Sequence, residues 1–127
     1  MKNHFLLLIL SICFITLTSC NKEEDGLEVQ IAGEYLGAFA SSATGNMDNF
    51  MIEVIKAGEN KVTVLPANGA VKFSSFTTDL EMANNNTIIA INQPEGCAAS
   101  FSLETPGGIA FNRIVGSEVI SFVGVRQ

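Results

Sequence analysis

Four glutamates have side chains that could do acid–base chemistry, and their spacing decides whether they are placed to do it. Two carboxylates at a suitable separation carry out glycoside hydrolysis. Nothing in the spacing pairs these glutamates, and no aspartate-rich spacing of the calcium-binding kind occurs in the chain. The sequence therefore predicts no catalytic residue, no metal site and no cofactor. The four candidates are Glu34, Glu53, Glu104 and Glu118.

Histidine and cysteine usage narrows the chemistry further. His4 is the only histidine, and the three cysteines are Cys13, Cys20 and Cys97. If residues 1–19 are removed as a targeting segment, no histidine remains for a Ser-His pair, a Cys-His pair or a zinc site. Once Cys20 is also modified, as argued below, Cys97 has no intramolecular disulfide partner. It is then either a reactive thiol or, as is more frequent for a free cysteine, a small buried side chain.

The first nineteen residues have the pattern of an export signal. Lys2 precedes a run of 13 uncharged residues at positions 5–17. This run is shorter than the about 20 apolar residues of a membrane-spanning helix. It also lacks the polar face, at helical spacing, of a helix packed on a core. A basic start, a short apolar middle and small residues at the end are typical of a secretory signal peptide, which we place at 1–19.

The end of this segment carries a more specific pattern. Leu17-Thr18-Ser19-Cys20 resembles the lipobox of bacterial lipoproteins. The resemblance implies that the Cys20 sulfur receives a diacylglycerol, that the chain is cut before Cys20, and that the new amino terminus is acylated, as with palmitate. Two or three acyl chains, at about 0.8 kcal/mol per buried methylene, would hold the chain on a membrane without spanning it.

A charged segment follows the cysteine. Asn21-Lys22-Glu23-Glu24-Asp25 resembles the surface-export signal of Bacteroidetes lipoproteins, in which a lysine and paired acids follow the lipidated cysteine. A charge run of this kind is also an ordinary solvated spacer. Asn21 is not the aspartate that favours inner-membrane retention in enteric bacteria. We expect a lipidated Cys20 and acidic linker at 20–28, and a lipid-anchored, surface-exposed position at the outer membrane; a periplasmic orientation stays open.

The composition of the mature chain excludes one class of partner. It would hold six basic and all thirteen acidic side chains, a formal charge of −7, and the basic residues form no patch or stripe. Nucleic acid is therefore not an expected partner. Tryptophan is absent and Tyr35 is the only tyrosine, which argues against a sugar-stacking surface. The length suits one domain, which we place at 29–127.

Short apolar segments alternate with turn residues throughout this domain. Phe50, Ile52 and Val54 share one face, as in a half-buried strand. Turn signals recur at intervals typical of an all-β sandwich or barrel. Segment 118–125 is apolar on both sides and should lie inside a sheet or against a neighbour, whereas 27–32 offers at most one helical turn. The expected turns lie at 57–60, 66–69, 84–86, 94–96, 106–108 and 116–117, and 70–83 is one bent strand or two.

Eight or nine strands joined by hairpins expose edges unless they close on themselves. Segment 31–37 resembles the first strand, and segment 121–126 the closing strand, of small lipocalin-like bacterial lipoproteins. Glycines in these segments would allow close strand approach. We predict an all-β, antiparallel up-and-down lipocalin-like barrel or closed meander, with a β-sandwich as the alternative.

Two non-enzymatic functions fit such a domain. The barrel could bind a small apolar ligand against inward-pointing side chains. In a small domain the same side chains would simply fill the core. The alternative is an envelope-displayed structural or protein-interaction module without a ligand cavity, using an exposed apolar patch around 47–51 or Phe73 and Phe76. The candidate ligand-lining residues are Phe50, Ile52, Phe73, Phe101 and Phe111.

Overall fold

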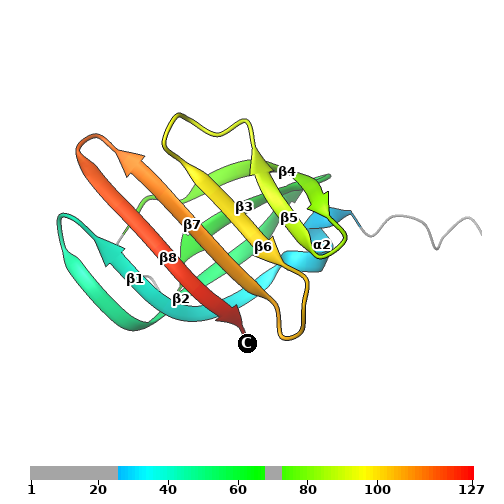
Figure 1. Ribbon diagram of the computed structural model, residues 1–127, viewed down its shortest axis with the longest axis horizontal. Coiled ribbons are helices and arrows are strands. Elements are labelled where there is room, and N and C mark those ends of the chain that lie inside the picture. Colours follow the sequence, from blue (N-terminus) through cyan, green and yellow to red (C-terminus); the bar gives the residue numbers. More distant parts are fainter. Residues whose placement is uncertain (1–25, 68–72) are drawn as a thin grey trace, which may run out of the picture.

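The computed structural model describes residues 26–67 and 73–127, which form a closed eight-stranded antiparallel barrel. Strand order follows chain order, and the last strand pairs with the first (Figure 1). The predicted up-and-down barrel is confirmed, and the β-sandwich alternative is wrong. The elements are α2 (Leu27–Ile31), β1 (Gly33–Ser41), β2 (Gly45–Gly58), β3 (Lys61–Pro66), β4 (Phe76–Asn84), β5 (Thr87–Ile91), β6 (Ala98–Ser102), β7 (Gly108–Val115) and β8 (Glu118–Arg126).

Alternation along the strands builds the core. Successive side chains of a strand point to opposite faces, so every second residue enters the barrel. In β2 the expected inward set of Phe50, Ile52 and Val54 is buried, and Glu53 between them points outward. The buried apolar residues form one cluster, which comprises Ile31, Tyr35, Phe39, Phe50, Ile52, Val54, Val62, Val64, Phe73, Phe76, Leu80, Ile88, Ala99, Phe101, Ile109, Phe111, Ile120 and Phe122.

Two glycines permit the closing pair of strands to approach. Gly37 of β1 lies opposite Gly124 of β8 in the register. A Cβ atom on Gly37 would overlap the backbone carbonyl of Val123, and one on Gly124 would lie 2.6 Å from the Phe122 ring. The close strand approach predicted for these glycines is confirmed.

Most connections lie where the turn residues predicted them. One was not predicted: Ser42, Ala43 and Thr44 join β1 to β2 without proline or glycine at the centre. Ser41 Oγ accepts hydrogen bonds from the backbone N–H of Ala43 (3.1 Å) and Thr44 (3.2 Å), so a serine side chain makes this turn. In the segment predicted at 70–83, β4 begins only at Phe76, and the buried Phe73 lies outside any strand.

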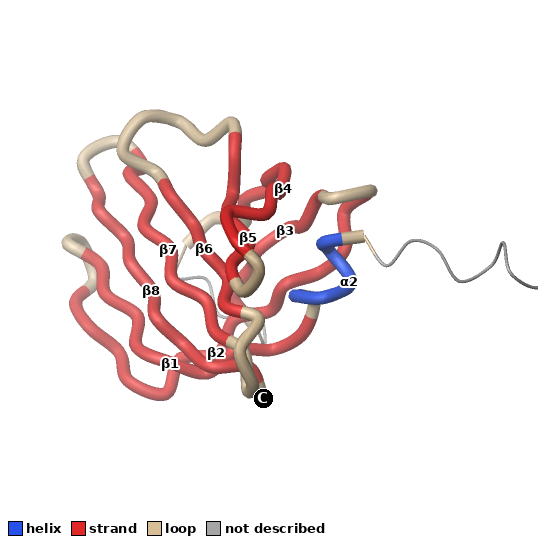
Figure 2. Tube along the Cα trace, turned by 45° about the vertical axis from the view of Figure 1, so that its right-hand side comes forward, coloured by secondary structure: helices blue, strands red, loops and turns tan. Residues whose placement is uncertain are grey.

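The short helix α2 covers one end of the barrel (Figure 2). The single helical turn predicted there is confirmed. The Leu27 N–H donates to Asn60 Oδ1 (2.9 Å), and the Asn60 N–H donates to Glu28 Oε2 (2.7 Å), which fastens the helix to the β2–β3 turn. Leu27 and Glu28, assigned to the linker at 20–28, thus belong to the folded unit. Residues 20–25 of that linker, including Cys20, and the signal at 1–19 lie outside the described residues.

Candidate functional site

The five residues predicted to line a ligand site all point into the barrel. Phe50, Ile52, Phe73, Phe101 and Phe111 are each at most 8% exposed. Phe50, Phe73 and Phe111 meet in one aromatic cluster, with 6.3 Å between the Phe50 and Phe73 ring centroids and 5.5 Å between those of Phe73 and Phe111. Ile52 and Phe101 are buried in the same core and make none of these ring–ring contacts.

Other rings fill the space around these three. Phe39 stacks on Phe50 at 4.8 Å, Phe122 stacks on Phe111 at 5.6 Å, and Phe76 meets Phe111 edge-on at 5.3 Å. Offset and edge-on pairs at these separations are the favoured packing of aromatic side chains. These rings therefore form a packed aromatic core inside the barrel. Alternation of inward and outward residues in β1 and β8 was the sequence signal that could have placed Phe39 and Phe122 among the inward-pointing residues.

An arginine closes over this cluster at the end opposite α2. Arg113 follows Ile109 and Phe111 on the inward side of β7, and its guanidinium carbon lies 4.2 Å from the centre of the Phe76 ring. Arg113 Nη1 donates to Gln93 Oε1 (2.8 Å), and Gln93 Nε2 donates to Thr78 Oγ1 (2.6 Å). A cation over an aromatic face is attracted to it. Arg113 therefore lies between the aromatic core and the solvent, and it is hydrogen-bonded through Gln93 to Thr78.

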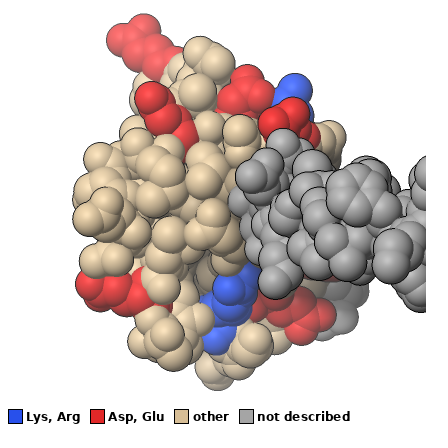
Figure 3. Space-filling model, turned by 90° about the vertical axis from the view of Figure 1, so that its right-hand side faces the viewer, with Lys and Arg blue, Asp and Glu red and all other residues tan. Residues whose placement is uncertain are grey.

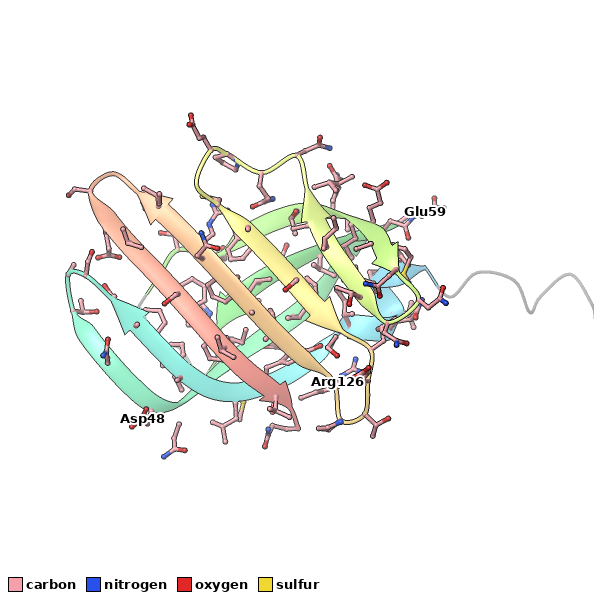
Figure 4. The ribbon with its side chains drawn as sticks, in the orientation of Figure 1. Asp48, Glu59 and Arg126 are labelled. Carbon is pink, nitrogen blue, oxygen red and sulfur yellow. The ribbon has the colours of Figure 1, made fainter. Side chains whose placement is uncertain are left out.

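Segments 31–37 and 121–126 meet at the α2 end of the barrel. The Arg126 guanidinium of β8 lies 6.0 Å from the Tyr35 ring of β1, and its Nη2 donates to the Ala32 carbonyl (Figure 4). The Tyr35 hydroxyl donates to the Ile31 carbonyl at 2.7 Å. Burial raises the pKa of Tyr35 above its ordinary value of 10.0, and the positive charge of Arg126 opposes this. These contacts tie the first strand, the last strand and α2 together.

The structure brings two of the four glutamates together, which their spacing did not predict. Glu34 and Glu53 lie opposite each other in the β1–β2 register, on the outer surface of the barrel. Glu104 lies in the β6–β7 connection, and Glu118 begins β8. In residues 26–67 and 73–127, no three histidine, cysteine, aspartate or glutamate side chains are grouped as a metal site would require.

Cys97 lies in the β5–β6 connection and contacts β7. Its sulfur accepts a hydrogen bond from the Ile114 N–H at 3.4 Å. The side chain is half-buried, so it is less enclosed than the expected core cysteine, and it is free. A half-buried thiol held on a backbone amide has a packing role.

A hollow lies on the outside of the barrel. It is a groove of about 500 Å³ over β5 to β8, and a smaller one of about 220 Å³ continues it along β6 to β8. Ser100 and Ala110 form the floor, and Ile89 and Val123 stand on either side. Neither patch suggested by the sequence matches it, since Phe73 and Phe76 are buried and Met47 lies on β2. The small residues on alternate positions of β6 and β7 were the sequence signal that could have predicted this groove.

Fold and grooves together define the class: a closed, eight-stranded antiparallel barrel with an aromatic interior and a shallow outer groove. No model of a protein family, no curated protein and no solved structure matches the chain. Within the part of the chain that is described, no helix has the length and apolar character needed to cross a membrane.

Proposed function

We propose that this chain is a lipoprotein, held at the outer membrane by acyl chains on Cys20 and displaying its barrel as a non-enzymatic structural or protein-interaction module. The support for the anchor is the order of features in the sequence: a basic start, a short apolar run, and Leu17-Thr18-Ser19-Cys20 at its end. The acidic segment after Cys20 supports a position on the outer surface.

The packing of the barrel supports a module in preference to a ligand carrier. All five candidate lining residues are engaged in the core, and the ring contacts from Phe39 to Phe122 occupy the interior. Core side chains packed in this way contribute to stability in a domain whose margin is small. The grooves described above lie outside the barrel, where another macromolecule can reach them.

Replacement of Cys20 tests the anchor. In a bacterium that lipidates exported proteins, we expect the wild-type chain in the membrane fraction, with a mass that includes diacylglycerol and lacks residues 1–19. Cys20→Ala should leave uncut precursor or protein released from the membrane. Cys97→Ala is the matched control, because it removes a cysteine from the barrel and leaves the anchor. An unchanged membrane fraction and mass for Cys20→Ala would refute the proposal.

A carrier of apolar ligands is the second candidate, favoured by the closed eight-stranded topology, which in other proteins encloses one small ligand. Binding of a ligand to the folded state raises the melting temperature. We expect no such rise when a delipidated sample is mixed with fatty acids or sterols, because the aromatic cluster occupies the interior. A concentration-dependent rise that Phe111→Ala alters would favour the carrier instead.

A further inference from the structure

The outer surface of β5 to β8 carries no charged side chain. The register places the outward residues of these strands in rows, such as Ile89, Ser100, Ala110 and Val123, each beside the next. The complete outward set of the four strands is Thr87, Ile89, Ile91, Ala98, Ser100, Ser102, Gly108, Ala110, Asn112, Ile114, Val119, Ser121, Val123 and Val125. We call this surface the neutral face; it is turned toward the viewer in Figure 1.

The charges are carried elsewhere on the barrel. Lys61 and Asp79 form an ion pair on the outside of β3 and β4, and Glu81 is the next outward residue of β4. Glu53 lies outward on β2, opposite Leu65 of β3. Asp48 and Glu59, at opposite ends of the molecule, lie away from β6 to β8 (Figure 4). Figure 3 likewise shows the acidic side chains in separate groups with uncharged surface between them. The neutral face is therefore the part of an acidic protein from which charge is missing.

The neutral face has a ridge beside a trough. Its ridge is formed by Val119, Val123 and Val125 of β8, which are 48%, 65% and 47% exposed. Its trough is the groove floored by Ser100 and Ala110 on the two adjacent strands. Strand β8 is hydrogen-bonded on both sides, to β7 and β1, yet its outward valines are uncovered. From the sequence, we expected this strand, which is apolar on both sides, to lie inside a sheet or against a neighbour. Within the described part of the chain, no element covers its outer side.

We propose that a second copy of this chain covers the neutral face, as a two-fold symmetric dimer in which the valine ridge of each copy enters the trough of the other. In a two-fold interface, the same patch serves both subunits, so residue i contacts j and j contacts i. A ridge and a trough side by side meet this requirement when the axis passes between β7 and β8. The inference names the partner of the interaction module proposed above, and it does not depend on lipidation.

Charge favours a second copy over other occupants. The chain is strongly acidic, so two copies repel except where each presents uncharged surface. A basic partner would find no carboxylate on this face. A lipid bilayer is a poor occupant too, because Ser100 and Ser121 would lose their water without gaining hydrogen-bond partners.

The size of the face sets the strength of the contact. Four adjacent strands at a spacing of about 4.8 Å, each contributing roughly five residues of about 3.3 Å, cover on the order of 300 Å² in projection. Stable dimers bury about 800 Å² on each partner. We therefore expect a weak dimer, with a dissociation constant on the order of 0.1 to 1 mM.

Sedimentation equilibrium of the chain from Gly26 measures this association. That chain contains every described element, and its closed ladder leaves no strand edge for residues 1–25 to complete. We expect the wild-type mass to rise from monomer toward dimer with concentration. Val123→Lys should weaken association by at least about 10-fold, because a lysine in the trough loses its hydration without a partner.

Ile55→Lys is the matched control, since Ile55 is a β-branched residue on the outside of β2 and 39% exposed. It should associate like the wild type, and all three proteins should share one melting temperature within a few degrees. A wild-type chain that stays monomeric to about 1 mM overturns the proposal, and so does a Val123→Lys chain that dimerises normally. A monomer that instead binds phosphatidylethanolamine vesicles through Val123 overturns it as well.

A charge exchange tests the ridge-in-trough register. Ser100→Glu and Val123→Lys should each be monomeric alone, because each introduces an unpaired charge. Mixed together, they should form a heterodimer in which the introduced lysine of one chain meets the introduced glutamate of the other, and the second contact is wild type. A mixture that remains monomeric refutes this arrangement.

Discussion

Tyr35 joins three elements at the α2 end of the barrel. It is 1% exposed, its hydroxyl donates to the Ile31 carbonyl of α2, and its ring lies beneath Arg126 of β8. A buried hydroxyl needs its partner, since an unpaired polar group in a core costs free energy. One tyrosine thus connects the helix, the first strand and the last.

Replacing Tyr35 by phenylalanine keeps the ring and removes the hydroxyl. The free energy of unfolding at neutral pH should fall by about 1 kcal/mol, because the Ile31 carbonyl loses its donor. The pKa of Tyr35 is raised in the folded state, so its neutral form stabilises the fold fully below pH 10.0. That contribution declines as pH rises through the folded-state pKa, because only the unfolded tyrosine ionises readily.

Urea unfolding of both proteins across this pH range checks the prediction. The wild type should lose stability above about pH 10, and the difference from Tyr35→Phe should narrow there, since phenylalanine does not titrate. A difference that stays constant or widens with pH would contradict the assignment.

At the scale of elements, the barrel depends on the seam between β1 and β8. These strands are far apart in sequence, and their pairing removes the two free edges of the sheet. The seam is tight at Gly37, where the carbonyl of Val123 occupies the position of a Cβ atom. Backbone cannot move aside as the end of a flexible side chain can, so this site requires glycine.

Gly37→Ala should therefore lower the free energy of unfolding by at least about 2 kcal/mol and open the seam. Gly108→Ala is the matched control, because its Cβ would meet the Gly124 carbonyl oxygen at 3.4 Å, an ordinary contact. Hydrogen exchange should show faster exchange along β1 and β8 in Gly37→Ala than in the wild type or the control. Equal protection in both variants would mean that the seam tolerates a side chain.

At the scale of the whole molecule, attraction between charges contributes little to stability. Lys61 and Asp79 form the ion pair found among the described residues, and each side chain is 44% exposed. Exposed pairs of this kind contribute about 0 to 1 kcal/mol. The formal charge of the full chain is −6, so its carboxylates mainly repel each other.

Added salt should therefore raise the melting temperature modestly. Between about 20 mM and about 500 mM NaCl, screening weakens the net repulsion by more than it weakens one exposed ion pair. Differential scanning calorimetry measures the change, and Lys61→Ala should show a similar rise. A melting temperature that falls with salt would indicate that attractive pairs dominate.

Much of the fold followed from local pattern. Alternation placed Phe50, Ile52 and Val54 on the inward face, and asparagine, glycine and proline marked most connections, because strand period and turn geometry depend on neighbouring residues. The Ser41 turn was missed because a side-chain hydrogen bond, rather than a special backbone residue, makes it. The candidate ligand-lining residues were predicted to point inward. Which of their rings contact each other could not be predicted, because the contacts join residues that are distant in the chain.

Composition, motif and strand period are properties of adjacent residues. They were therefore enough to predict an acidic chain with an expected lipid anchor and an all-β domain with its inward faces. Three relations could be seen only in the folded barrel: Tyr35 meets Arg126, Glu34 lies opposite Glu53, and β5 to β8 share an uncharged outer face. These relations depend on strand register around a closed barrel, where a shift of one residue would reverse every side chain.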